Sequence, residues 1–166
     1  MPAQTLSAEE RGGAMKGEKL APLAYVSAAL LVMVVSFWLE PRFTLSREIA
    51  KPAGLLVCAL AMMLFTWALA HLRSAFLGNV APVTNQLVTS GPYRWLRHPT
   101  YLATVIALLG LALALRSPWG LAVTLALFLP AAVYRARLEE RALDRRFGLA
   151  WDDYAARTGF LIPKLW

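Results

Sequence analysis

Four apolar segments limit the fold of this chain more than any other feature of its sequence. They cover residues 22–39, 53–72, 101–115 and 119–134. A helix needs about twenty apolar residues to cross the hydrocarbon core of a bilayer, and the first two segments have that length. The last two are shorter, so we expect them to tilt little, to thin the bilayer or to extend into their flanks. The pattern predicts an all-α membrane protein with about four transmembrane helices.

The composition supports this fold class. Of the 166 residues, 58% are hydrophobic and only 16% are charged, whereas a soluble domain averages about 25% charged residues. The net charge is +7, but the basic residues lie in short loops and in the tail beside apolar segments and form no nucleic-acid patch. We therefore expect membrane lipids with anionic headgroups as their partners, and no nucleic acid.

One cysteine and two histidines restrict the available chemistry. A single cysteine cannot form an intrachain disulfide, and these residues do not supply the ligand set of a zinc or iron site. We therefore predict no metal site. Cys58 lies inside an apolar segment, where a lone cysteine usually packs as a small hydrophobic side chain.

The distribution of lysine and arginine predicts the orientation. With four spans, the N-terminal tail, the 73–100 loop and the C-terminal tail share one side of the membrane, and they hold 13 of the 17 basic residues. The positive-inside rule places that side in the cytoplasm. The chain is short and rich in alanine, leucine and arginine, which is typical of a bacterial protein. We therefore expect a bacterial inner membrane location with both termini cytoplasmic.

The last two segments are predicted to form a helical hairpin. Arg116-Ser117-Pro118 is a turn sequence that joins them as antiparallel helices. Small residues recur on one face of the third segment, which allows a second helix to approach closely, either within the chain or in a dimer. They are Ala103, Ala107, Gly110 and Ala114. Pro130 removes a backbone hydrogen bond in the fourth segment and is expected to kink it.

Residues 91–101, GPYRWLRHPTY, lie at the start of the third segment and form the most unusual stretch of the chain. They combine two arginines, one histidine, three aromatic residues and two prolines. Ionisable groups are costly near a bilayer, so a cluster of them there often serves a function. Arg, Tyr and Trp also mark membrane interfaces without taking part in chemistry, and the composition of this stretch alone fits that interpretation as well.

The sequence of residues 134–148, YRARLEERALDRRFG, predicts a helix that continues the fourth segment past the membrane surface and stops at Gly148. One row of this helix carries Arg135 and Glu139 at its membrane end, with Leu143 and Phe147 further out. A solvated face would not combine charges with large apolar residues in this way. We therefore treat Arg135 and Glu139 as candidates for a buried functional role.

The other arginines of this helix are expected to bind lipid phosphates along an amphipathic surface. They are Arg137, Arg141, Arg145 and Arg146. A second short helix is predicted for residues 151–157, with Trp151 and Tyr154 facing the body of the protein. The apolar segment 159–163 is expected to tuck under the hairpin.

Taken together, GPYRWLRHPTY, a two-helix hairpin and RxRLEERxLxxRFGxxWxxYxxRTGFLIP resemble the isoprenylcysteine carboxyl methyltransferase family and its bacterial relatives. This wider group includes phospholipid N-methyltransferases. The resemblance covers the second half of the chain, residues 78–166, and both blocks occur in the same order with the hairpin between them. The first two apolar segments resemble only generic anchors.

This resemblance implies an integral membrane methyltransferase. Such an enzyme transfers a methyl group from S-adenosyl-L-methionine to a lipid-like or amphipathic acceptor, for example a carboxylate, and leaves S-adenosyl-L-homocysteine. On this basis residues 1–20 form a mobile polar tail and residues 21–77 two anchoring helices. Because no small-residue cleavage site ends the first apolar run, we interpret it as an anchor and not as a signal peptide. Residues 78–166 form the catalytic core, whose cytosolic tail closes a cofactor cavity.

Matched position by position, the resemblance implies cofactor contacts in both blocks. The cofactor-binding residues would be Asn85, Gln86, Leu87, Val88, Tyr93, His98, Pro99, Thr100, Tyr101 and Glu139. Arg135 matches the catalytic position that faces the acceptor. Asn85 and Gln86 replace a commoner pair that contains histidine, and the chain has fewer spans than the eukaryotic members.

Two other interpretations are open. Sterol reductases have a similar arrangement of tail and hairpin and bind NADPH, although they are larger and usually have asparagine where this chain has Pro99. A non-catalytic membrane protein would use the arginines as lipid anchors. The motifs favour no particular acceptor among a prenylated cysteine, a phospholipid headgroup, a thiol and another lipid, and no particular oligomeric state. The methyltransferase interpretation depends on one spatial prediction, that the C-terminal tail folds back onto the His98–Pro99 turn.

Overall fold

The computed structural model describes the backbone of residues 8–77 and 87–164, and the side chains of residues 20–72 and 87–164. Within these ranges the chain is helical apart from loops and a single bridge between Leu96 and Gly159, and the predicted all-α class is confirmed. The α-helices are α1 (Ala8–Trp38), α2 (Arg47–Leu77), α3 (Pro99–Ala114), α4 (Pro118–Val123), α5 (Leu129–Phe147) and α6 (Leu149–Arg157). The two shorter turns are the 3₁₀ helix η1 (Gly91–Arg94) and the π-helix η2 (Thr124–Phe128).

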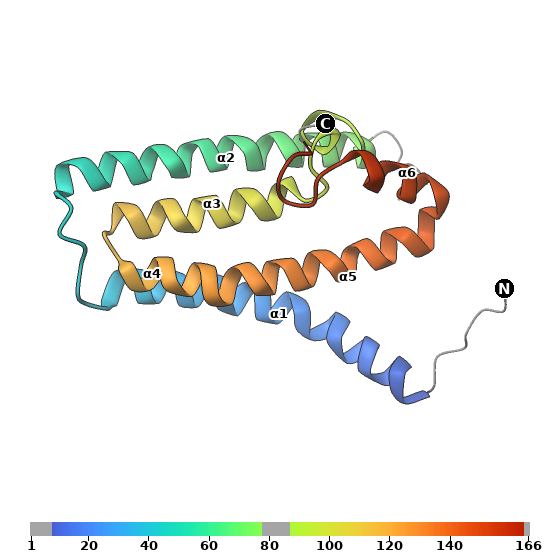
Figure 1. Cartoon of the computed structure of the whole chain (residues 1–166), viewed down its shortest axis with the longest axis horizontal. Helices are drawn as coiled ribbons and strands as arrows, with labels where there is room; N and C mark the ends of the chain where they lie inside the picture. The colour runs from blue at the N-terminus through green and yellow to red at the C-terminus, as the bar shows by residue number, and fades with distance from the viewer. Residues whose placement is uncertain (1–7, 78–86, 165–166) are drawn as a thin grey trace.

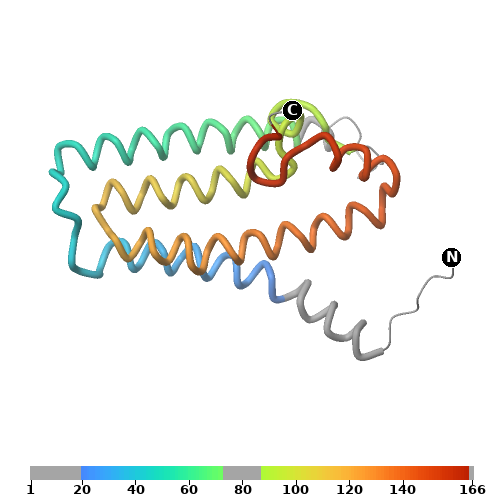
Figure 2. The backbone as a smooth tube through the Cα atoms, in the orientation of Figure 1, coloured from blue at the N-terminus to red at the C-terminus, as the bar shows by residue number. Residues whose placement is uncertain are grey.

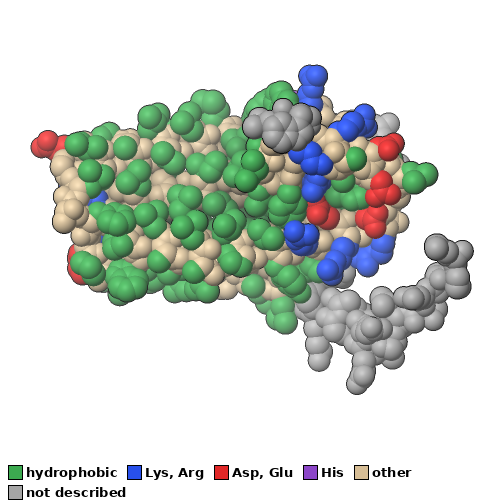
Figure 3. All heavy atoms as spheres, viewed as in Figure 1, with side chains coloured by type: hydrophobic (Ala, Val, Ile, Leu, Met, Phe, Trp, Pro, Cys, Tyr) green, Lys and Arg blue, Asp and Glu red, His purple; other side chains and the backbone are tan. Residues whose placement is uncertain are grey.

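The long helices lie side by side in one elongated bundle (Figures 1 and 2). α3 packs along α2 on one side and contacts α1, α4 and α5 on the other. α6 and the C-terminal segment fold back over the start of α3, at one end of the bundle (Figure 1). Figure 3 shows charged side chains gathered at this end, whereas hydrophobic side chains cover most of the remaining face. This distribution is that of a protein embedded in a bilayer.

Among the described residues, three helices are long and apolar enough to cross a membrane: Leu20–Trp38, Arg47–Leu72 and Pro118–Phe147. The expected third span, α3, has 16 residues and is shorter than these. Its turn to the next helix is formed as predicted, because Ser117 accepts a hydrogen bond from the Gly120 backbone N–H at 3.0 Å and caps α4. The last two apolar segments therefore do form an antiparallel hairpin (Figure 1).

The fourth apolar segment runs without a break into the C-terminal tail, because α4, η2 and α5 follow one another directly. The disturbance expected at Pro130 takes the form of the π-helical turn η2, which immediately precedes α5. Proline lacks an N–H and its ring pushes away the carbonyl four residues earlier, and a π-turn accommodates both effects. α5 ends at Phe147, and Gly148, with φ +51°, is its C-cap residue and stops the helix as predicted.

Small side chains bring α2 and α3 into close contact. A Cβ atom on Gly54 would collide with the backbone of Gly110 and Ala114. A Cβ atom on Gly110 would lie 2.9 Å from the Cys58 Sγ, and this thiol donates to the Ala107 carbonyl at 3.4 Å. The small-residue face of α3 thus serves a contact within the chain, and Cys58 is part of that packing, as expected.

The C-terminal segment pairs with the residues that precede α3. The Gly159 N–H donates to the Trp95 carbonyl at 3.0 Å, and the Arg97 N–H donates to the Gly159 carbonyl at 2.8 Å. The His98 N–H donates to the Phe160 carbonyl at 3.3 Å. The prediction that the tail folds back onto the His98–Pro99 turn is therefore confirmed.

At the opposite end of the bundle, Arg42 ties α1 to α3. Its Nη2 donates to the Phe37 carbonyl at 2.6 Å, and its Nη1 donates to the Leu115 carbonyl at 3.1 Å. Both carbonyls lie at helix C-termini, where they lack partners within the helix and attract a cation. This contact fixes α1 along the bundle.

Candidate active site

A cavity of about 650 Å³ lies where the tail covers the start of α3. Its walls come from the ends or middle of α1, α2, α3, α5 and α6 and from the loop around η1. The volume falls in the range of roughly 300–1,000 Å³ that small-molecule sites occupy. The predicted row on α5 faces this cavity throughout, since Arg135, Glu139, Leu143 and Phe147 all line it.

The structure brings most of the predicted site residues to this cavity. Those that line it are Leu87, Val88, Tyr93, His98, Thr100, Tyr101, Arg135 and Glu139. Pro99 does not line it; it is buried and begins α3, with His98 before it as the N-cap residue. Asn85 and Gln86 lie outside the described residues.

Gly91 sets the geometry of the motif loop. It has φ +59°, a conformation that disfavours other residues, and a Cβ atom there would lie 2.6 Å from the His71 ring. The 3₁₀ turn η1 starts at this residue and carries Tyr93, whose side chain is buried. The loop can therefore pass close to α2 and still direct Tyr93 into the cavity wall.

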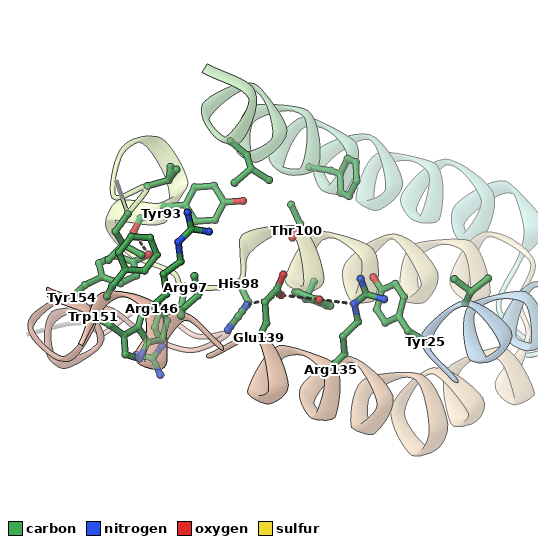
Figure 4. A pocket seen from close by; sticks show the side chains of 18 residues that line it. Tyr25, Tyr93, Arg97, His98, Thr100, Arg135, Glu139, Arg146, Trp151 and Tyr154 are labelled. Carbon is green, nitrogen blue, oxygen red and sulfur yellow. Dashed lines mark hydrogen bonds and ion pairs between the residues drawn. The ribbon is translucent and has the colours of Figure 1, made fainter. Parts of the chain in front are cut away.

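A chain of hydrogen bonds joins α5 to the first turn of α3. The Arg135 Nε donates to the Tyr101 hydroxyl at 2.8 Å, and that hydroxyl donates to the Glu139 Oε2 at 2.9 Å. The side chain of Glu139 keeps 52% of its surface exposed, so its carboxylate remains open to the cavity. Figure 4 shows Glu139 between His98 and Arg135. Of the described residues that line the cavity, Glu139 alone carries a carboxylate.

Arg97, which lines the cavity, and Glu140, which does not, form a second link between the motif loop and α5. The Arg97 Nε lies 2.6 Å from the Glu140 Oε1, and both side chains are largely buried. The Arg97 Nη1 also donates to the Ala155 carbonyl at 2.9 Å and to the Thr158 carbonyl at 2.6 Å. One guanidinium thus connects the motif loop to α5 and to the end of α6, so the tail cannot move away without breaking charge-assisted hydrogen bonds.

His98 is a buried imidazole close to both glutamates. Its Nε2 lies 3.3 Å from the Glu140 Oε1, but it forms no well-directed hydrogen bond with any described group. Burial lowers the pKa of His98 below its ordinary 6.5, and this effect outweighs the opposing charges of Glu140 and Glu139. The imidazole is therefore neutral at pH 7.

Buried aromatic side chains form the end of the cavity farthest from Arg135 (Figure 4). Tyr93, Trp151 and Tyr154 all line it, and the Tyr154 hydroxyl donates to the Tyr93 carbonyl at 2.8 Å. Burial is the main cause that raises the pKa of Tyr93 and of Tyr154 to about 12. Both phenols thus stay neutral at physiological pH, and their rings can stabilise a desolvated cation. The prediction that Trp151 and Tyr154 face the body of the protein is confirmed.

Sequence reasoning missed the contribution of the first two helices. Tyr25 and Val26 of α1 line the cavity, as do Phe65 and Leu72 of α2. A tyrosine near the end of an apolar segment indicates a membrane interface in general. No local pattern distinguishes that role from a place in a cavity wall, because the difference depends on which helix lies opposite.

Comparison with known proteins gives the family. Residues 49–150 match the phospholipid methyltransferase family, so more than half of the chain is covered and the chain belongs to this family. The match begins at residue 49 and therefore includes most of α2, which the two motif blocks alone did not reach.

Three relatives are similar over different lengths. Protein-S-isoprenylcysteine O-methyltransferase of Saccharomyces cerevisiae is 27% identical over 149 residues, which are 85% of this chain and 62% of that protein. The lamin-B receptor of Drosophila melanogaster is 24% identical over 151 residues, 82% of this chain and 20% of the receptor. The nickel-cobalt-cadmium resistance protein NccN of Alcaligenes xylosoxydans xylosoxydans is 38% identical over 85 residues, 49% of this chain and 38% of that protein. The chain thus spans less than two thirds of the length of each.

The described residues contain no group of three or more His, Cys, Asp or Glu side chains that could hold a metal ion.

Proposed function

We propose that this protein is an integral membrane methyltransferase that uses S-adenosyl-L-methionine and methylates the anionic group of an amphipathic acceptor. The observation that carries the proposal is the hydrogen-bonded series Arg135–Tyr101–Glu139 in the cavity wall. It sets a carboxylate and a guanidinium apart on one helix face, as a site for a cationic cofactor and an anionic acceptor requires. Membership of the phospholipid methyltransferase family and similarity to the yeast isoprenylcysteine methyltransferase support it.

The residues present fit this cofactor. S-adenosyl-L-methionine carries a sulfonium, an ammonium and ribose hydroxyls, and its chemistry is to supply an electrophilic methyl group. The aromatic faces of Tyr93 and Tyr101 suit a sulfonium, and Glu139 can accept hydrogen bonds from the ammonium or the hydroxyls. Thr100 and His98 add polar atoms, and Leu87 and Val88 add apolar surface. We also assign cofactor contacts to Asn85 and Gln86. Pro99 contributes by fixing the turn before α3.

Arg135 suits an anionic acceptor. Its Nε is occupied by Tyr101, and within the described residues no carboxylate lies within 4.0 Å of its guanidinium. The terminal amino groups are thus available to a carboxylate or a similar anion. Val26 and Phe65 add apolar surface to the cavity wall, which suits the chain of a lipid-like molecule.

An ionised carboxylate needs no general base, because it is already deprotonated at neutral pH. An amine acceptor would need one. Glu140, one candidate base, does not line the cavity and is paired with Arg97. Catalysis then consists chiefly of holding the two reactants in line and excluding water. The tail residues Leu143, Phe147 and Trp151 contribute to that exclusion, since they form the cover of the cavity.

The proposal includes location. We place the cavity end of the bundle in the cytoplasm of a bacterial inner membrane, because basic residues concentrate there and the positive-inside rule assigns such an end to the cytoplasmic side.

The test is cofactor binding by detergent-solubilised protein. Tritiated S-adenosyl-L-methionine should bind and should be displaced by S-adenosyl-L-homocysteine but not by NADPH. Binding of NADPH instead would indicate a membrane reductase, and binding of neither would indicate a non-catalytic membrane protein. Mass spectrometry of a lipid extract incubated with enzyme and a deuterated methyl donor then identifies the acceptor, which we expect to gain the label on an acidic oxygen.

A further inference from the structure

Tyr25 lies in the cavity wall, although it belongs to α1, which precedes the residues that match the family. Its ring meets three side chains. The Arg135 Cζ lies 5.5 Å from the ring centroid. The Tyr101 ring lies edge-on, with centroids 5.5 Å apart and planes at 80°, and the Phe128 ring lies 4.9 Å away, tilted by 45°. Figure 4 shows Tyr25 beside Arg135, on the side away from Glu139.

These contacts hold the Arg135 guanidinium from two directions. Tyr101 accepts its Nε–H at 2.8 Å, and the face of Tyr25 covers it at cation–π distance. A guanidinium has five N–H donors in one plane. Once the Nε–H and the plane are fixed, the four N–H groups of the two terminal amino groups point in set directions. That is the arrangement that binds a carboxylate through two parallel hydrogen bonds.

We propose that Tyr25 is a positioning residue that orients Arg135 toward the anionic group of the methyl acceptor, so that α1 is part of the active site as well as a membrane helix. This inference rests on the proposed function. Recognition of the acceptor then depends on a side chain outside the residues that match the family. The π-face of Tyr25, and not its hydroxyl, makes the contact with Arg135.

The packing around Tyr25 explains how a helix without a catalytic motif takes this place. Phe128 and Arg135 lie two turns apart on the continuous helix and therefore share one face. Ala132 lies between them and is fully buried. Its small side chain leaves room for the Tyr25 ring, which packs against this cluster. The π-turn η2 ends at Phe128, so the face that meets Tyr25 begins where the helix returns to α-geometry.

The experiment compares Tyr25→Phe, which keeps the ring, with Tyr25→Leu, which removes it. Tyr134→Leu is the matched control, because Tyr134 is the exposed neighbour of Arg135 and does not line the cavity. The first readout is the NMR signal of the Arg135 Nε–H in detergent-solubilised, ¹⁵N-arginine-labelled protein, assigned by its loss in Arg135→Lys. Protons over an aromatic face are shifted upfield. Wild type, Y25F and Y134L should share the shifted signal, and Y25L should lose the shift.

The second readout is steady-state methylation of S-farnesylcysteine, a probe that carries a free carboxylate. In Y25L its KM should rise by about tenfold, the order expected for losing a desolvated cation–π contact, while the affinity for S-adenosyl-L-methionine stays unchanged. Y25F should behave as wild type. Several results would overturn the inference. In the NMR experiment these are a wild-type signal that is not shifted upfield, or a Y25L signal at the wild-type position. In the kinetic experiment these are equal impairment of Y25F and Y25L, or a loss of cofactor affinity in Y25L as large as the rise in its KM.

The two proposals fail in different ways. If the wild-type protein binds no S-adenosyl-L-methionine, the proposed function is wrong, whereas the NMR comparison is made without cofactor or acceptor and still decides whether Tyr25 orients Arg135. If wild type methylates the probe and all three variants match it, only the role of Tyr25 is wrong.

Discussion

The Tyr101 hydroxyl lies between two charged side chains of α5: it accepts from the Arg135 Nε at 2.8 Å and donates to the Glu139 Oε2 at 2.9 Å. One phenol thus connects the residue proposed for the acceptor with the residue proposed for the cofactor. Because Arg135 and Glu139 are one turn apart on α5, they share a face, and Tyr101 of α3 reaches both.

The two charged residues should have separable effects. Glu139→Ala should abolish binding of S-adenosyl-L-methionine, because it removes the carboxylate that faces the cavity, and Arg135→Ala should leave cofactor affinity intact and reduce turnover. Equilibrium binding and initial rates measure the two effects. Asp144→Ala, an exposed change on the same helix, serves as the control. If R135A weakens cofactor binding as much as E139A does, then Arg135 belongs to the cofactor site.

Tyr101→Phe should impair both functions at once. The change keeps the ring and its packing, but it removes a hydrogen bond to each of two charged groups, and such bonds contribute about 1.5–3 kcal/mol. We expect cofactor affinity and kcat/KM each to fall by about tenfold or more, and the free energy of unfolding to fall by roughly 1.5–3 kcal/mol. Tyr134→Phe is the matched control, since Tyr134 is exposed. Wild-type kinetics in Y101F would show that the hydrogen-bonded series Arg135–Tyr101–Glu139 has no functional role.

Removal of Arg97 should loosen the tail. Arg97→Met removes the ion-pair partner of Glu140 and the hydrogen bonds from Arg97 to the Ala155 and Thr158 carbonyls. The free energy of unfolding should fall by about 2 kcal/mol. This is less than the loss expected for a fully buried ion pair, because both side chains keep some exposure. A lower apparent Tm and faster chymotryptic cleavage within the tail measure it. Arg94→Met, a change at an exposed position, should have neither effect.

A double variant provides the sharper test of that ion pair. Arg97→Met combined with Glu140→Gln should be less destabilised than R97M alone, since no unpaired charge is left behind. Simple addition of the two single effects would mean that the two residues do not interact energetically.

Stability should fall as the pH is lowered through the range below 6.5. Burial lowers the folded-state pKa of His98, with Glu140 and Glu139 opposing that shift and Arg97 adding to it. The unfolded chain therefore takes up a proton first, so the contribution of the neutral imidazole is complete above the unfolded pKa of about 6.5 and is lost as the pH falls. Apparent Tm measured from pH 7.5 to pH 5 should decline less steeply in His98→Gln. Parallel curves would contradict a depressed pKa.

The contact between α2 and α3 should tolerate no added methyl group. Gly54→Ala places a Cβ against the backbone of Gly110 and Ala114, which cannot yield as a flexible side chain does. We expect a loss of about 1–3 kcal/mol in stability, read from the midpoint of detergent-induced or thermal unfolding. Ala59→Val, on an exposed face of the same helix, is the control. Equal stability of G54A and wild type would show that the helices lie further apart than described.

Much of the fold follows from local pattern. Apolar length predicts the first and second spans, and the Ser117-Pro118 turn predicts the hairpin. The fourth segment reaches spanning length only together with the helix that continues it to Phe147. The row from Arg135 to Phe147 faces a cavity as the 3.6-residue period of the helix predicts. The third segment is short in the sequence and forms the short helix α3. Local pattern did not reveal which residues fix its start, which is held by backbone bonds from Arg97 to Gly159 and from His98 to Phe160.

By itself, the sequence determined a bundle of apolar helices, the order of the two motif blocks and the face of α5 that carries charge, since helical periodicity and the cost of burying polar groups act within each segment. The tertiary structure alone decided that Tyr25 of α1 contacts Arg135 and that α2 packs against the small residues of α3. A period specifies which side chains share a face, but the helix that covers that face is selected by packing across the whole bundle.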